Sequence, residues 1–238
     1  MLSTPTFPRQ HRARRRLAAG LVAAVILLIA AAPVRAANPD PIFLIHGYRG
    51  AASNLSELRT WLQAQGRTVV ALSLPGQDNK VNAKYIKDQA VTRGWKRFDL
   101  VMHSMGGLSG RYLIKSLGGT ATVQGYVSLG APQYGLYSAC VLPSFYGGQM
   151  CPWNSFLTAL NSGDDTPNGP AWATIYSRSD EIVPYASSRL DGGACHFEVS
   201  GITHSGLLHS PTVTFPRILG ALDDAADTIC PTGGSYRS

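Results

Sequence analysis

The sequence predicts an α/β fold with a central, mostly parallel sheet of about six strands, covered by helices on both faces. Short apolar runs alternate along the chain with longer stretches whose apolar residues recur at helical spacing, which is typical of parallel strands joined by helices. Several short runs are apolar at every position, as strands buried between two helical layers must be. We expect these strands at residues 41–46, 68–72, 98–103, 123–129, 172–176 and 196–199.

Helices are expected in the longer stretches between the strands. The first shows the pattern clearly: Asn54, followed by Glu57 three residues later, is typical of a helix N-terminus, and Gly66 of a helix end. Leu58 and Leu62 then lie on one face of this helix. The expected helices cover residues 54–66, 79–93, 105–117, 153–161 and 212–226.

The first 36 residues are expected to be a signal peptide. Five arginines precede an apolar run at residues 17–32, and Val34 and Ala36 are suited to positions −3 and −1 of a cleavage site after Ala36. The run is shorter than the roughly 20 apolar residues that a membrane-spanning helix needs. Residues 37–238 then form a single secreted domain, and the arginine run leaves the export route open.

The charge of the chain resides mainly in this export signal. The whole sequence has 21 Lys and Arg against 14 Asp and Glu, but residues 37–238 have 15 against 14, a net charge of +1. A net charge so close to zero supports neither the basic surface of a nucleic-acid-binding protein nor a patch for anionic membranes. We therefore expect no nucleic-acid partner.

All four cysteines lie in the exported part: Cys140, Cys151, Cys195 and Cys230. An even number of cysteines in an oxidising compartment indicates two disulfides, with three pairings allowed. We favour Cys140 with Cys151, and Cys195 with Cys230. The spacings lack the C-x₂-C pair of a zinc site, and no H-E-x-x-H motif or carboxylate cluster occurs, so neither a metal nor a cofactor is expected.

A nucleophilic serine is predicted where the strand at 98–103 runs into a helix. The sequence Met102-His103-Ser104-Met105-Gly106 resembles the G-x-S-x-G turn that lifts a serine hydroxyl out of a sheet. Such a hydroxyl needs a neighbouring base to become nucleophilic. Met102 departs from the pattern, because it must either point into a gap or push strand and helix apart.

Two backbone N–H groups are expected to stabilise the oxyanion that forms when Ser104 attacks a carbonyl. One belongs to Met105, at the start of the following helix. The other belongs to Tyr48, which follows the pair His46-Gly47 at the end of the first strand.

The acid and the base are expected downstream in the order acid, then histidine. Asp180 follows the strand at 172–176, at the sheet edge where active-site loops gather. Its competitors, Glu181 and Asp191, are interpreted as solvated loop carboxylates.

His204 is the predicted base because it lies in the loop after the last strand, where Asp180 can orient its imidazole. The alternatives are His209, interpreted as part of a packed segment, and His196, inside a strand and interpreted as structural. His103 is expected to point away from Ser104 by strand alternation, in a packing or supporting role.

With these residues in place, the chain resembles the small secreted bacterial triacylglycerol lipases of the class 2 type. The resemblance covers most of residues 41–226 and is carried by residues 46–47, 103–107, 175–180, 188–192 and 204–208. It implies a minimal α/β-hydrolase with Ser104, Asp180 and His204 as catalytic triad. It also implies Tyr48 and Met105 as the oxyanion donors. We further expect an acyl-enzyme mechanism on small-molecule or lipid esters, transient contact with a lipid surface, and a monomer.

Residues 133–170 depart from this family by their length and by their cysteines, and are rich in Gly, Pro, Ser, Tyr and Asn. A stretch of this kind is uncommon unless it is functional or tied down. We expect a small cap over the site, stapled by Cys140 and Cys151. Its apolar residues are expected to line an acyl pocket: Tyr134, Leu136, Tyr137, Val141, Leu142, Phe145, Tyr146, Trp153 and Phe156.

Other functions are compatible with the same fold and the same three catalytic residues. An esterase or a secreted acyltransferase needs the same triad, because neither fold nor triad fixes the acyl length or the acceptor. A peptidase lacks any sequence feature for a specificity pocket here. A non-catalytic binding protein on this scaffold is hard to reconcile with Ser104, Asp180 and His204 in order.

Overall fold

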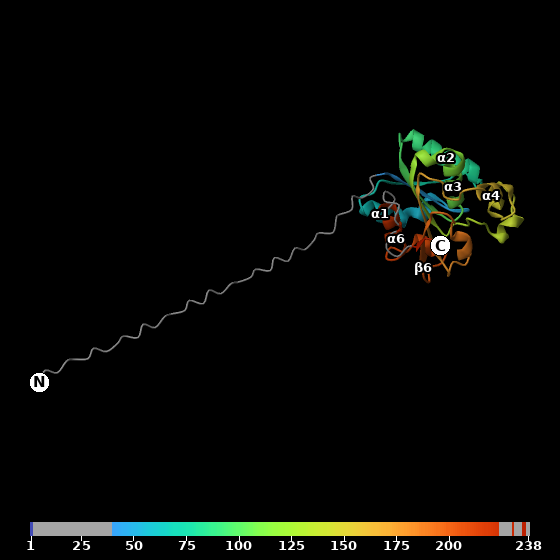
Figure 1. Ribbon diagram of the computed structural model, residues 1–238. Helices are drawn as coiled ribbons and strands as arrows, with labels where there is room; N and C mark the ends of the chain where they lie inside the picture. Colours follow the sequence, from blue (N-terminus) through green and yellow to red (C-terminus); the bar gives the residue numbers. More distant parts are fainter. Residues whose placement is uncertain (2–39, 224–229, 231–234, 237–238) are drawn as a thin grey trace. The chain divides into compact units, whose positions relative to one another are not determined.

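The computed structural model describes Met1, residues 40–223, Cys230 and residues 235–236, so that the predicted signal peptide lies outside the described residues apart from Met1. Six parallel strands form one open sheet, as predicted (Figure 1). Their order in the sheet is β2-β1-β3-β4-β5-β6. A two-residue strand, β7 (Ser235–Tyr236), pairs antiparallel with β6. The parallel strands are β1 (Ile42–Ile45), β2 (Val69–Leu72), β3 (Phe98–His103), β4 (Val123–Leu129), β5 (Ala171–Ser177) and β6 (Cys195–Val199).

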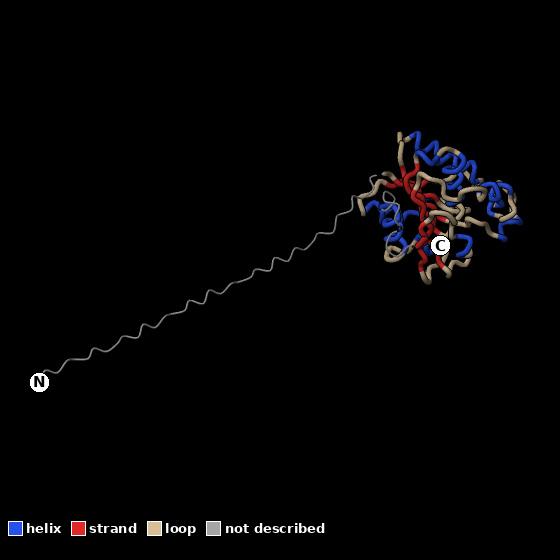
Figure 2. The backbone as a smooth tube through the Cα atoms, in the orientation of Figure 1, coloured by secondary structure: helices blue, strands red, loops and turns tan. Residues whose placement is uncertain are grey.

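Helices cover both faces of the sheet, which appears as the red layer in Figure 2. Strand β1 shows why: its side chains alternate between two separate cores, with Ile42 and Leu44 in one and Phe43 and Ile45 in the other. The first core is closed by α1 (Ser56–Ala64) and α6 (Thr214–Asp223), and the second by α2 (Asn79–Thr92) and α3 (Gly106–Ser116). Among the described residues, no helix has the length and apolarity needed to cross a membrane.

The start of α1 differs from the prediction. A 3₁₀ turn, η1 (Ala52–Leu55), precedes the helix, and Asn54 does not cap it. Instead, the Asn54 side-chain oxygen accepts a hydrogen bond of 2.7 Å from the Ala51 N–H. A short polar side chain satisfied within its own turn no longer serves the helix end.

Met102 occupies a gap between the strand and the helix that follows Ser104. It lies on β3, is fully buried, and directs its sulfur at Gly110 on α3, where a Cβ atom would overlap that sulfur. The glycine expected at position 102 is therefore replaced by one on the facing helix. As a result, strand and helix approach closely without being forced apart.

Residues 133–163 form a layer of short helical turns beside α3: η3 (Tyr137–Val141), η4 (Gly148–Met150) and α4 (Ser155–Leu160). The Cys140–Cys151 disulfide ties η3 to the residue that follows η4. Leu136 and Phe156 are buried together with Leu108 of α3 in a third core cluster. The second disulfide joins Cys195 at the start of β6 to Cys230, so both bridges are the pairs favoured from the sequence.

Arg111 of α3 holds both ends of this layer. Its guanidinium is fully buried and donates to Asn161 Oδ1 at 2.8 Å and to Asp165 Oδ1 at 2.7 Å, while the Gln133 carbonyl lies 3.5 Å away. A buried charge requires such partners to offset its lost hydration. The helix that follows Ser104 is therefore fastened to the segment beside it.

Replacing Arg111 by Met should destabilise the protein by about 3 kcal/mol, because it leaves the partners of a buried ion pair without their cation. The free energy of unfolding in urea measures this loss. The matched control is Arg178→Met, which breaks the exposed pair between Arg178 and Glu198 and should change the free energy of unfolding much less, because water screens that pair. Equal losses in the two variants would contradict the anchoring role.

Candidate active site

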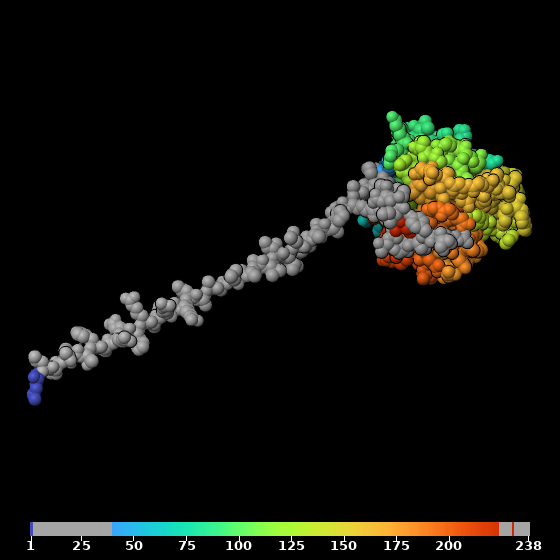
Figure 3. Space-filling view, in the orientation of Figure 1, coloured from blue at the N-terminus to red at the C-terminus, as the bar shows by residue number. Residues whose placement is uncertain are grey.

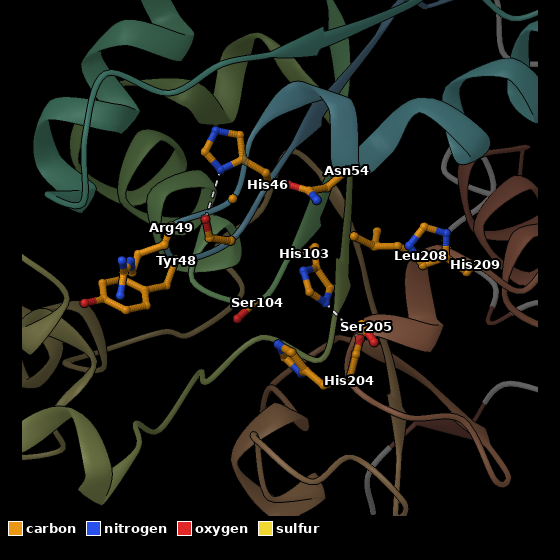
Figure 4. A pocket seen from close by; sticks show the side chains of 12 residues that line it. His46, Tyr48, Arg49, Asn54, His103, Ser104, His204, Ser205, Leu208 and His209 are labelled. Carbon is orange, nitrogen blue, oxygen red and sulfur yellow. Dashed lines mark hydrogen bonds between the residues drawn. The ribbon is translucent and has the colours of Figure 1, made fainter.

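Ser104 sits on a strained turn between β3 and α3. Its φ of 53° lies in the left-handed region, which non-glycine residues rarely adopt, and this turn lifts the side chain out of the sheet. Gly47 packs against it so closely that a Cβ there would lie 2.6 Å from Ser104 Cβ. The Ser104 side chain therefore projects into a cavity at the carboxyl ends of β1, β3 and β6 (Figure 4).

His204 and Asp180 form a hydrogen-bonded pair beside Ser104. The His204 Nδ1–H donates to Asp180 Oδ2 at 2.8 Å, which leaves Nε2 as the ring nitrogen that can accept a proton. Figure 4 shows the His204 ring and the Ser104 hydroxyl facing each other. Gly130, with a φ of 54°, makes room for the pair, because a Cβ there would lie 2.8 Å from Asp180 Oδ2.

Asp180 is held in its ionised form. Burial raises its pKa, but the hydrogen bonds from His204 and from the Val183 and Ile182 N–H groups outweigh burial, so the pKa lies below its ordinary value. The two backbone groups donate to Oδ1 at 2.7 and 2.9 Å. They leave Oδ2 directed at the imidazole.

Glu181 also contacts the base, which sequence reasoning missed. Its Oε2 accepts a hydrogen bond of 3.0 Å from the backbone N–H of His204. Glu181 is an exposed loop carboxylate, as interpreted from the sequence, but it has this additional contact. No sequence signal pairs these two residues, because their contact depends on how two loops fold together.

His103 faces the site, whereas strand alternation predicts that it points away. Its ring centroid lies 4.5 Å from that of His204, and its Nε2–H donates to the His204 carbonyl at 3.0 Å. The prediction fails because the chain leaves the strand at Ser104, where alternation ends. Burial, and then repulsion by His204, lowers the pKa of His103 to about 3, so its ring is uncharged at neutral pH.

His46 shapes the loop that carries the expected oxyanion donor Tyr48. Its Nε2 accepts a hydrogen bond of 2.9 Å from the Leu74 N–H, so Nδ1 carries the proton and donates to the Gly47 carbonyl at 2.9 Å. Burial lowers the pKa of His46 and so favours this neutral form. Within residues 40–223, the N–H groups of Tyr48 and Met105 donate to no other group, which leaves them available to an oxyanion.

The alternative candidates for the base and the acid have contacts outside the pair formed by His204 and Asp180. His196 donates from Nε2 to the Leu190 carbonyl at 2.7 Å and is buried in β6. His209 lies at the rim of the Ser104 cavity, and its Nδ1 is 2.8 Å from Glu57 Oε2. Asp191 does not line that cavity. No group of three or more His, Cys, Asp or Glu suited to a metal ion occurs in the part of the chain that the structure describes.

The cavity has a volume of about 280 Å³ and is lined by none of the nine residues expected to form an acyl pocket. Leu136 and Phe156 are buried in the core instead, and Tyr137, Phe145 and Trp153 are exposed on the outer surface. The lining residues are His46, Gly47, Tyr48, Arg49, Gly50, Asn54, His103, Ser104, His204, Ser205, Leu208 and His209.

Several solved structures share this fold, although no protein-family profile matches the chain. Lipase BlEst2 of Bacillus licheniformis in its mature form aligns with a TM-score of 0.63 and 17% identity, over 79% of this chain and 93% of that one. Lipase B of Aspergillus fumigatus aligns at 0.65 and 20%, over 86% and 56%. An α/β hydrolase from a lagoon-sediment metagenome aligns at 0.60 and 19%, over 76% and 89%. These similarities establish the α/β-hydrolase fold for this chain.

Proposed function

We propose that this protein is a secreted carboxylic ester hydrolase, a lipase or lipolytic esterase, that works through an acyl-enzyme on Ser104. The observation that carries the proposal is the hydrogen bond of 2.8 Å between His204 Nδ1 and Asp180 Oδ2, beside a serine on a strained turn. This bond fixes the tautomer in which Nε2 can take the serine proton. The α/β-hydrolase fold and its lipase neighbours are consistent with this chemistry.

Each step has a named group. His204 Nε2 accepts the proton of Ser104 as Oγ attacks the ester carbonyl, and the Tyr48 and Met105 N–H groups stabilise the oxyanion. His204 then gives the proton to the leaving alcohol. In the second half it takes a proton from water, which attacks the acyl-enzyme, and returns that proton to Ser104 as the acid leaves.

Secretion is part of the proposal. Both cysteine pairs are oxidised, and disulfides persist in oxidising compartments. Together with the export pattern of residues 1–36, this supports an extracellular enzyme. The class 2 lipase type is proposed from the sequence resemblance around Ser104, Asp180 and His204, and the disulfides depart from it.

The uncharged surface of residues 116–163 supports the proposal that the substrate lies in a lipid aggregate. These residues contain no Asp, Glu, Lys or Arg, yet they expose large apolar side chains: Tyr137, Val141, Phe145, Tyr146 and Trp153. Part of this segment forms the yellow-green edge of the surface in Figure 3. We call these five residues the exposed apolar patch. The Tyr137 and Trp153 rings pack together with centroids 5.4 Å apart, and Tyr146 contacts Tyr48 of the oxyanion loop. An exposed apolar patch beside a reactive serine suits a neutral lipid aggregate.

The double variant Tyr137→Ser/Trp153→Ser should lower activity on emulsified tributyrin by about tenfold or more, because burial of each aromatic ring in lipid contributes about 1.5–3 kcal/mol to adsorption. Activity on soluble p-nitrophenyl acetate should stay within about twofold, since neither ring lines the cavity. Titration of released acid and absorbance measure the two rates. The control is Val91→Ser, which removes a 72% exposed apolar side chain from α2. Equal losses on both substrates would contradict surface binding.

A further inference from the structure

The wall of the cavity beside Ser104 contains an arginine and no carboxylate. Arg49 lies on that wall, whereas no Asp or Glu does. The Asp180 side chain is only 1% exposed and accepts a hydrogen bond from His204 behind the wall. Because no carboxylate on the wall offsets the charge of Arg49, the cavity favours an anionic group over a neutral one.

The Arg49 guanidinium has no protein partner within the described residues. The side chain is exposed, and among those residues it makes no hydrogen bond, ion pair or ring contact. The backbone of this residue is held in place, because the Arg49 N–H donates to Gln77 Oε1 at 2.8 Å. An arginine that is fixed at its backbone and unpaired at its guanidinium can offer two parallel N–H donors to a carboxylate.

The backbone conformation at Arg49 would suit a glycine better than an arginine. Its φ is 53°, and the only other non-glycine residue with a positive φ in the described part of the chain is Ser104. Glycine adopts this conformation without the steric cost that a side chain adds. Strained residues that persist at a reactive site are candidates for a functional role. The strain therefore indicates that the Arg49 side chain contributes something that glycine could not.

The position of Arg49 relative to Ser104 assigns it to the acyl part of the ester. In the proposed reaction His204 Nε2 protonates the leaving oxygen, so the alcohol lies on the His204 side of Ser104. In Figure 4, Arg49 and Tyr48 lie on the opposite side of Ser104 from His204. An acyl chain that leads away from His204 therefore passes Arg49.

We infer that Arg49 binds the distal carboxylate of esters whose acyl chain ends in a carboxylate, such as half-esters of dicarboxylic acids. The guanidinium holds this carboxylate by charge-assisted hydrogen bonds while Ser104 attacks the ester carbonyl at the other end of the chain. The cavity volume of about 280 Å³ leaves room for a short chain between the two groups. The inference rests on the proposed ester hydrolysis and adds to it the charge of the acyl group.

The experiment compares mono-p-nitrophenyl adipate with p-nitrophenyl hexanoate, which has the same number of acyl carbons but ends in a methyl group. Both are used below their solubility limits, and spontaneous hydrolysis is subtracted. The measured quantity is the ratio of kcat/KM for the adipate to kcat/KM for the hexanoate. This ratio should fall about fivefold in Arg49→Gln, because an exposed charge-assisted contact is lost. Arg49→Lys should retain most of the wild-type ratio, since it keeps the charge.

Salt provides a second measurement on the same two esters. Raising NaCl from about 20 mM to about 500 mM should lower the wild-type ratio toward that of Arg49→Gln, because salt screens an exposed charge pair. The ratio of Arg49→Gln itself should change little. A wild-type ratio that does not respond to salt contradicts binding of the carboxylate by Arg49.

The control variant is Arg59→Gln, which removes an exposed cation of α1 that does not line the cavity, and it should keep the wild-type ratio. An unchanged ratio in Arg49→Gln, or an equal fall in Arg59→Gln, overturns the inference, while Ser104-dependent hydrolysis of the hexanoate leaves the proposed function standing. Hydrolysis of neither ester by the wild-type enzyme overturns both.

Discussion

Replacement of Ser104 by Ala should lower kcat for ester hydrolysis by at least about four orders of magnitude. The variant keeps the oxyanion donors and the cavity but has no oxygen to form the acyl-enzyme. The Ser104 side chain lines the cavity, so loss of its hydroxyl leaves the surrounding packing almost unchanged. The initial rate on a soluble short-chain ester, at substrate concentrations above KM, measures the effect.

The same experiment has an internal check. Because triad members act as a unit, Ser104→Ala/His204→Ala should be hardly slower than either single variant. A serine-reactive phosphonate should label the Ser104 peptide in the wild-type enzyme, as mass spectrometry after digestion would show. Full labelling of the Ser104→Ala variant would overturn the assignment of the nucleophile.

Asp180→Asn should lower kcat by about 10⁴-fold, because it forces the wrong tautomer on His204. The Ile182 and Val183 N–H groups donate to Oδ1 and therefore retain the carbonyl oxygen of the new amide at that position. The amide NH₂ then faces His204 Nδ1, which must accept, so the ring proton moves to Nε2. That nitrogen can no longer take the proton of Ser104.

Glu181→Gln is the matched control, since it removes one charge from the next residue but keeps an oxygen that can accept from the His204 N–H. Its kcat should remain within about tenfold of wild type. If Glu181→Gln were as slow as Asp180→Asn on the same ester, the loss would reflect charge near the base rather than its tautomer.

The sheet could be predicted because its signal is local. Strands buried on both faces are apolar at successive positions, and β3 and β4 begin and end at the predicted residues. The turn around Ser104 could be located for the same reason, since it joins the end of an apolar strand to a helix.

The supporting contacts of the candidate base could not be predicted. Glu181 and His204 are 23 residues apart, and His103 and His204 are 101 apart, so their contacts depend on where loops meet in space. A pattern of single residues also cannot show that the backbone turns at Ser104. The orientation of His103 was therefore mistaken.

The prediction that the aromatic residues at 133–163 line an acyl pocket failed for a different reason. Their composition is the same whether they line a pocket or face outward. The direction is set by Leu136 and Phe156, which fill the contact with α3, and by the Cys140–Cys151 bridge, which holds the turns. Tyr137 and Trp153 are then left on the outside.

The fit of the Met102 sulfur over Gly110 makes the effects of substitutions at these two positions depend on each other. Alanine at position 110 clashes while methionine is present at 102, but a prior change of Met102 to glycine would make room for it. The reverse order requires the buried Met102 side chain to move away from the new methyl group. The cost of a methyl group at position 110 therefore depends on which residue occupies position 102, so the order in which the two substitutions are made affects the stability of the intermediate sequence.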